Sequence, residues 1–70
     1  MNASFRVGRL SALRESGDRV TLVIDGEPFE ARWPGFRTVM RDERIQLGDE
    51  IEFIVDEDGS LVSIDRFDPD

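Results

Sequence analysis

Two groups of side chains in this sequence could bind a ligand, and they carry opposite charges. The acidic group lies toward the end of the chain and consists of Glu50, Glu52, Asp56, Glu57 and Asp58. The cationic and aromatic group lies in the middle and consists of Arg32, Trp33, Phe36, Arg37, Arg41 and Arg44. A row of carboxylates can attract a basic surface, whereas arginines neutralise phosphates and aromatic rings stack on bases.

Catalytic and metal-binding chemistry has little support in the residue types. The chain contains no Cys and no His, which removes disulfides, thiolate nucleophiles, imidazole acid-base catalysis and the commonest zinc ligands. The serines have neither a His nor a Lys to activate them. Asp56-Glu57-Asp58-Gly59 resembles the start of a calcium loop, but the twelfth position holds Phe67 instead of Glu. We therefore predict a protein that is not an enzyme and that holds no cofactor or metal.

The negative charge of the chain is concentrated in its last third. Residues 1–46 hold eight Arg and seven acids, for a net charge of +1, whereas residues 47–70 hold one Arg and nine acids, for −8. The length of 70 residues predicts one small domain over 1–70, with 68–70 frayed. No long apolar run opens the sequence, so we expect no secretory signal, no membrane span and a cytoplasmic location.

Alternating apolar residues predict three strands in the first half. Phe5 and Val7 have one parity and Leu10 and Ala12 the other, which predicts a long first strand that changes face at Gly8. After a turn at residues 16–18, the second strand should point Val20, Leu22 and Ile24 inward. Asp25-Gly26 is a strong hairpin signal and leads to a third strand with one face formed by Phe29, Ala31 and Trp33.

The second half predicts a short helix followed by a hairpin. Phe36, Val39 and Met40 have the i, i+3, i+4 spacing of one helical face. A fourth strand should then bury Ile51, Phe53 and Val55, and after a turn at residues 56–59 a fifth strand, Ser60 to Phe67, should bury Val62 and Ile64.

This order of elements predicts an all-β fold. It favours a five-stranded, OB-like Greek-key barrel with one short helix or helical turn between strands three and four. An SH3-like barrel is the alternative, and it would place the helical turn between the last two strands. In the first arrangement Thr21 lies on the outer face of strand two, which is the usual ligand face of an OB barrel, so Thr21 joins the cationic and aromatic group as a candidate nucleic-acid contact.

Four short segments resemble bacterial translation initiation factor one and the wider S1-like OB domains. They are Val7-Gly8-Arg9-Leu10, residues 19–26, residues 29–35 and residues 47–53. The resemblance implies an OB fold with a basic loop after strand three that meets ribosomal RNA. By position, that loop maps to Gly35, Phe36, Arg37, Met40 and Arg41.

The two groups of side chains lead to two functional hypotheses. Alternate strand residues lie about 6.8 Å apart, close to the ~7 Å phosphate spacing of extended nucleic acid, so Glu50 and Glu52, continued by Asp56, could imitate phosphates. We predict an acidic binding module for a basic, nucleic-acid-handling protein, comparable to phage-encoded inhibitors that mimic nucleic acid. The alternative is an RNA-binding or ribosome-binding factor, which the negative charge of residues 47–70 would oppose.

Each group also has a purely structural interpretation. Trp33 and Phe36 could close one end of the barrel while the arginines pair with nearby acids, and the carboxylates could serve only solubility. The number of copies in the assembly stays open, since an exposed edge of the first or fifth strand could pair two chains.

Overall fold

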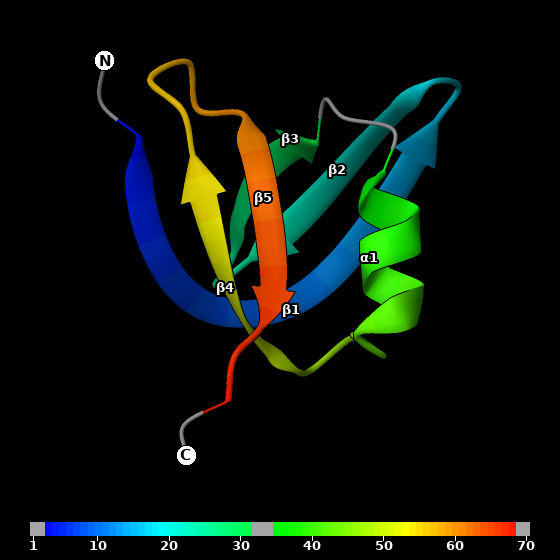
Figure 1. Cartoon of the computed structure of the whole chain (residues 1–70). Coiled ribbons are helices and arrows are strands. Elements are labelled where there is room, and N and C mark those ends of the chain that lie inside the picture. The colour runs from blue at the N-terminus through cyan, green and yellow to red at the C-terminus, as the bar shows by residue number, and fades with distance from the viewer. Residues whose placement is uncertain (1–2, 32–34, 69–70) are drawn as a thin grey trace.

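The computed structural model describes residues 3–31 and 35–68 and consists of strands joined by short turns, with one helix (Figure 1). The elements are β1 (Ser4–Ser16), β2 (Arg19–Ile24), β3 (Glu27–Ala31), α1 (Phe36–Asp42), β4 (Glu50–Val55) and β5 (Leu61–Arg66). The short helix between the third and fourth strands was predicted and is confirmed. In the described ranges, no helix has the length and apolar character needed to cross a membrane.

The five strands close into a ring in the order β1-β2-β3-β5-β4. All neighbours are antiparallel except β3 and β5, which are parallel and meet at Ala31 and Leu61. The long strand β1 pairs with β4 through its first half and with β2 through its second half. Figure 1 shows it as a strongly curved ribbon that runs along both halves of the sheet.

The irregularity in β1 lies later than the sequence predicted. Its pairing with β2 shifts between Leu10 and Ala12, and Gly8 is buried on the same face as Leu10. The predicted change of face at Gly8 is therefore wrong, and Phe5 and Val7 point outward, with exposed fractions of 64% and 38%. Their apolar character suggested an inner face, but regular alternation from Gly8 and Leu10 puts them outside.

Gly8 is required by the close approach of the β2–β3 turn. A Cβ at this position would lie 2.7 Å from both Ile24 Cγ2 and Asp25 Oδ2. The predicted Asp25-Gly26 turn is confirmed, with φ of 53° and 80°, as a two-residue hairpin turn requires. Asp25 also ties this turn to β1, because the Arg9 amide donates to Asp25 Oδ1 at 3.0 Å and the Asp25 amide donates to the Arg9 carbonyl at 2.9 Å.

The buried core follows the predicted alternation in β2, β3 and β4 but only in part in β5, where Ile64 is buried as predicted. Within the described ranges it comprises Leu10, Val20, Leu22, Ile24, Phe29, Ala31, Phe36, Ile45, Ile51, Phe53, Val55, Leu61 and Ile64. Val62 was predicted to point inward but is 47% exposed. The pairing of β4 with β5 shifts between Ile54 and Val55, which leaves Leu61 and Ile64 as the inward residues. Trp33 lies outside the described residues. The same holds for residues 69–70, which are most of the end predicted to fray.

Helix α1 packs Phe36 into the core. The helix ends with Arg44 in a left-handed backbone conformation, which is unfavourable for residues other than glycine. The Ile45 amide donates to the Met40 carbonyl and the Arg44 amide to the Arg41 carbonyl, which is the Schellman pattern. Arg44 occupies the left-handed position of this motif, with φ of 56°, where glycine is usual.

Replacing Gly8 should destabilise the fold through the close approach. We expect Gly8→Ala to lower the free energy of unfolding by about 1–3 kcal/mol, because the new methyl group overlaps atoms of Ile24 and Asp25. Urea unfolding followed by circular dichroism measures the change. Gly17→Ala is the control, since nothing lies within 4 Å of a Cβ there and its cost of about 1 kcal/mol comes from positive φ alone. Equal costs for both variants would contradict the close approach.

Relieving the backbone strain at Arg44 should stabilise the protein. We expect Arg44→Gly to raise the free energy of unfolding by about 0.5–1 kcal/mol, because glycine adopts positive φ without a Cβ clash. Arg44→Ala removes the same charge but keeps the strain, so it should give no gain. A shift of the urea midpoint at unchanged slope distinguishes the two variants.

Candidate functional site

The predicted acidic residues of β4 lie on its outer face, and an apolar residue follows them. Ile51, Phe53 and Val55 are buried, so Glu50, Glu52 and Ile54 point away from the core. Glu50 is exposed, whereas Glu52 and Ile54 are half-buried. Ile54 therefore separates these two carboxylates from Asp56, the next acid along the chain.

Strands β1 and β5 add side chains that the sequence analysis did not assign to this site. Glu52 pairs with Val7 on one side and with Asp65 on the other, while Ile54 has Phe5 and Ser63 as neighbours. We call these six residues the β1–β4–β5 face: Phe5, Val7, Glu52, Ile54, Ser63 and Asp65. The predicted turn at residues 56–59 indicated that β4 and β5 pair. It did not indicate the register of that pairing, which places Asp65 beside Glu52.

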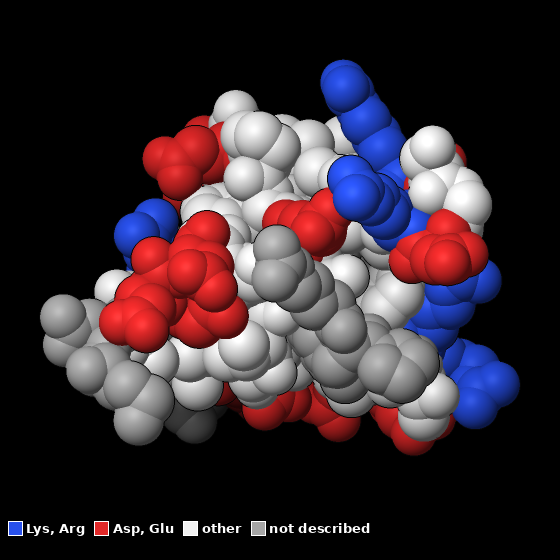
Figure 2. Space-filling view, turned by 90° about the horizontal axis from the view of Figure 1, so that it is seen from above, with Lys and Arg blue, Asp and Glu red and all other residues white. Residues whose placement is uncertain are grey.

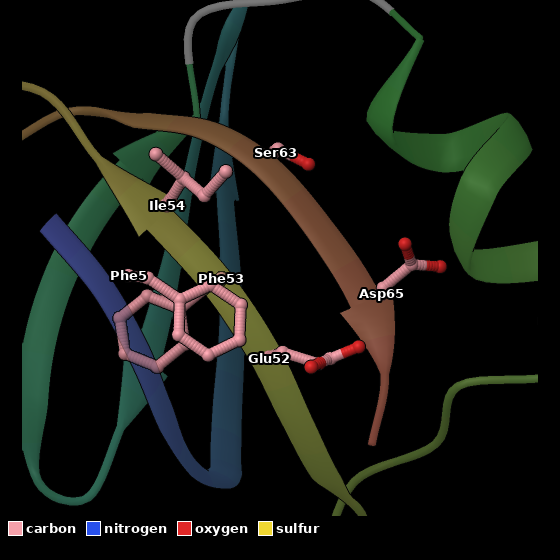
Figure 3. Close-up of a pocket in the computed structure, with 6 residues that line it drawn as sticks. All are labelled: Phe5, Glu52, Phe53, Ile54, Ser63 and Asp65. Carbon is pink, nitrogen blue, oxygen red and sulfur yellow. The ribbon is translucent and has the colours of Figure 1, made fainter. Parts of the chain in front are cut away.

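A shallow hollow of about 80 Å³ lies on the β1–β4–β5 face. Its lining includes Phe5 from β1, Glu52 and Ile54 from β4, and Ser63 and Asp65 from β5. Figure 3 shows Glu52 and Asp65 projecting from neighbouring strands, with the ring of Phe5 toward the β1 side. The hollow thus combines two carboxylates, a hydroxyl group and exposed apolar carbon.

The acids of the β4–β5 turn differ in their roles. Asp56 Oδ1 accepts hydrogen bonds from the amides of Asp58 and Ser60, both at 2.9 Å. The Gly59 amide donates to the Asp56 carbonyl at 3.0 Å, and Gly59 has φ of 83°. Asp56 therefore holds the turn together, while Glu57 and Asp58 are exposed to solvent.

Four of the eight arginines in the described ranges form ion pairs, and all four partners are acids outside the predicted acidic group. The ion pairs are Arg6 with Glu27 at 3.7 Å, Arg19 with Glu30 at 4.0 Å, Arg41 with Asp42 at 3.8 Å, and Arg37 with Glu15. In this part of the chain, no ion pair involves the predicted acidic group or Asp65.

The two signs of charge are only partly separated in space. Figure 2 shows a cluster of acids on the left, at the β4–β5 turn, and most of the visible arginines on the right, with further acids among the arginines and along the lower edge.

The structure brings only some of the cationic and aromatic group together. Arg37, Arg41 and Arg44 are exposed on or just after α1, and the Arg37 guanidinium lies 5.6 Å from the centre of the Phe36 ring. Phe36 is 5% exposed, so its ring has no free face on which a base could stack. Thr21 is half-buried on β2, opposite Arg14 and Glu30. Arg32 and Trp33 lie outside the described residues.

Comparison with known proteins finds no match to this chain, whether among family models, curated proteins or solved structures. Among the residues that the structure describes, no three His, Cys, Asp or Glu side chains converge so that they could hold a metal ion. The charge and exposure of the surface residues are therefore the basis for a functional proposal.

Removing the side-chain acceptor of Asp56 should destabilise the turn. We expect Asp56→Ala to cost about 1–2 kcal/mol, because two amides lose their partner and one belongs to buried Ser60. Asp56→Asn keeps an acceptor oxygen and should cost less, and Glu57→Ala should stay within about 0.5 kcal/mol. Thermal unfolding at fixed pH ranks the three variants. A loss for Glu57→Ala as large as that for Asp56→Ala would contradict the assigned roles.

Proposed function

We propose that this protein is a non-enzymatic, acidic binding module that engages a basic surface on a nucleic-acid-handling protein and competes there with nucleic acid. The observation that carries the proposal is the pattern of charge pairing. Arg6, Arg19, Arg37 and Arg41 form ion pairs with acids elsewhere, whereas Glu50, Glu52, Glu57 and Asp58 form no ion pair in the described ranges, although Arg9 lies opposite Glu50 on β1. Unpaired charges of one sign create the field that steers an oppositely charged partner.

We further propose that the closed sheet is an OB-like Greek-key barrel. The ring order, the parallel contact of β3 with β5 and the helix between β3 and β4 support this arrangement. OB folds bind ligands through the face of strands two and three and through the β1–β2 and β4–β5 loops. Glu57 and Asp58 belong to the β4–β5 loop, which is consistent with a binding role for that loop.

The apolar residues beside the carboxylates favour a protein partner over a nucleic acid. Ile54 follows Glu50 and Glu52 on the outer face of β4, and Phe5 neighbours Ile54 on β1. Bare phosphate rows offer no apolar contact, while protein interfaces combine an apolar centre with a polar rim. Only Glu50 and Glu52 would thus imitate phosphates on the outer face of β4. Apolar contact with Ile54 and Phe5 would add to the affinity for a protein partner.

Capture of a partner tests the proposal. The immobilised protein is exposed to a nuclease-treated lysate of the organism that encodes it, and bound proteins are identified by mass spectrometry. We expect enrichment of basic, nucleic-acid-binding proteins that single-stranded RNA displaces, with capture largely lost on substituting Glu50→Gln, Glu52→Gln, Asp56→Asn, Glu57→Gln and Asp58→Asn together. Asp56→Asn keeps an acceptor for the turn, so the variant should stay folded.

A matched pair of variants separates a localised site from net charge. Glu57→Gln/Asp58→Asn and Asp18→Asn/Glu43→Gln remove the same charge, and all four residues are exposed. Capture should weaken in the first variant and persist in the second. Undiminished capture by the variant with all five substitutions would refute the acidic-surface proposal.

An RNA-binding function is the second candidate, and the arginines around α1 favour it. Arg37, Arg41 and Arg44 are exposed, and Arg44 is kept in a left-handed conformation that its residue type disfavours. In this case the protein itself would bind single-stranded RNA at low salt, with saturable NMR shifts around α1 that Arg41→Ala/Arg44→Ala abolishes. Such a result would replace the first proposal, because the acidic module competes with RNA without binding it.

A further inference from the structure

We propose that the β1–β4–β5 face seats an arginine side chain of the protein partner, with its guanidinium between Glu52 and Asp65 and its apolar stem against Phe5 and Ile54. This inference rests on the proposed function, because it assumes that a basic protein is bound. It goes further by naming the side chain that is recognised and the residues that recognise it.

The apolar half of the seat is exposed to solvent. Phe5 is 64% exposed, and Val7, the next outward residue of β1, is 38% exposed. Both lie beside Ile54 and Glu52 on the neighbouring strand β4. Exposed apolar side chains that adjoin one another and are bordered by polar groups are typical of interaction surfaces. A partner residue with a long apolar stem could cover Phe5 and Ile54.

The charged half of the seat lacks a cation. Glu52 and Asp65 occupy directly opposite positions on β4 and β5, and like charges in that arrangement destabilise a sheet. Within the described ranges, neither carboxylate forms an ion pair. A bound cation between them would remove the repulsion, so the face is complementary in charge to a basic side chain.

An arginine fits the combination of an apolar half and a charged half better than a lysine does. Its planar guanidinium has a fork of donors that can bond two carboxylates at once, and it can also stack on an aromatic ring such as Phe5. The Ser63 hydroxyl lines the same hollow and offers a further acceptor. A lysine ammonium provides a compact, strongly hydrated charge that does not stack in this way.

The experiment titrates the full-length protein with a short, end-capped peptide of alternating Arg and Val, followed by backbone NMR. Twin peptides carry Lys or neutral citrulline in place of Arg. We expect saturable shifts centred on Phe5, Glu52 and Asp65, weaker binding of the Lys peptide, and no saturable binding of the citrulline peptide. Glu52→Gln/Asp65→Asn should weaken binding by about tenfold or more, as expected for charged partners at the centre of an interface.

Two further variants test the geometry of the seat. Phe5→Ala should weaken binding of the Arg peptide by about fivefold and that of the Lys peptide by less, because the planar guanidinium stacks on the ring in addition to the contact that either apolar stem makes. Asp18→Asn/Glu43→Gln removes the same charge as Glu52→Gln/Asp65→Asn and should change affinity by less than about twofold. Relief of repulsion predicts that Glu52→Gln/Asp65→Asn is at least as stable as the parent protein, so lost binding would not reflect unfolding.

The outcomes separate this inference from the proposed function. If the two charge variants weaken binding equally, or if shifts centre on the β4–β5 turn and ignore Glu52→Gln/Asp65→Asn, the arginine seat is refuted while the acidic module stands. Self-association through Phe5, detected by sedimentation and abolished by Phe5→Ala, would also overturn the seat and assign the face to a second copy of the chain. The variant with five substitutions could lose lysate capture while the peptides cause no saturable shifts on the β1–β4–β5 face. That result would refute the arginine seat and leave the acidic module standing.

Discussion

The structure depends on one strand that serves two halves of a sheet. Leu10, which is fully buried, sits where β1 changes partner: its amide donates to the Asp49 carbonyl at 3.0 Å and its carbonyl accepts from the Gly48 amide at 2.7 Å. From Leu10 onward the strand pairs with β2, with a register shift between Leu10 and Ala12. A single irregularity at this point lets one continuous strand bend around the core and close the ring, since a bulge increases local bend and twist.

This bend determines which residues reach the surface as candidate contacts. With Gly8 and Leu10 on the inner face, Phe5 and Val7 lie outside, beside the outer face of β4. The partner strand β5 completes the same surface with Asp65. Helix α1 contributes Phe36 to the core, which removes that ring from any surface site. The fold therefore places exposed apolar side chains next to the carboxylates of β4 and β5. The exposed arginines Arg37, Arg41 and Arg44 lie on or just after helix α1.

The distribution of charge follows from local pairing more than from composition. Arg37 pairs with Glu15 across the end of β1, and Arg41 pairs with Asp42 on its own helix, so the cationic side is partly neutralised. In the described ranges the acids of β4 and of its turn form no ion pair, although Arg9 lies opposite Glu50 on β1. The acids of the β4–β5 turn thus form a local excess of negative charge in a chain whose net charge is −7. Such a local excess orients an approaching partner even when each single exposed pair contributes little.

The sequence by itself determined the local elements, because turn chemistry and alternation act over a few residues. It predicted the Asp25-Gly26 turn, the inward faces of β2 and β4, and the helix from Phe36. Only the tertiary structure decided the outward position of Phe5 and Val62 and the pairing of Glu52 with Asp65. Those depend on register shifts at Leu10 and Ile54, and a shift of one residue exchanges the two faces of a strand. Register is set by which strands pair across the ring, and no short stretch of sequence carries that information.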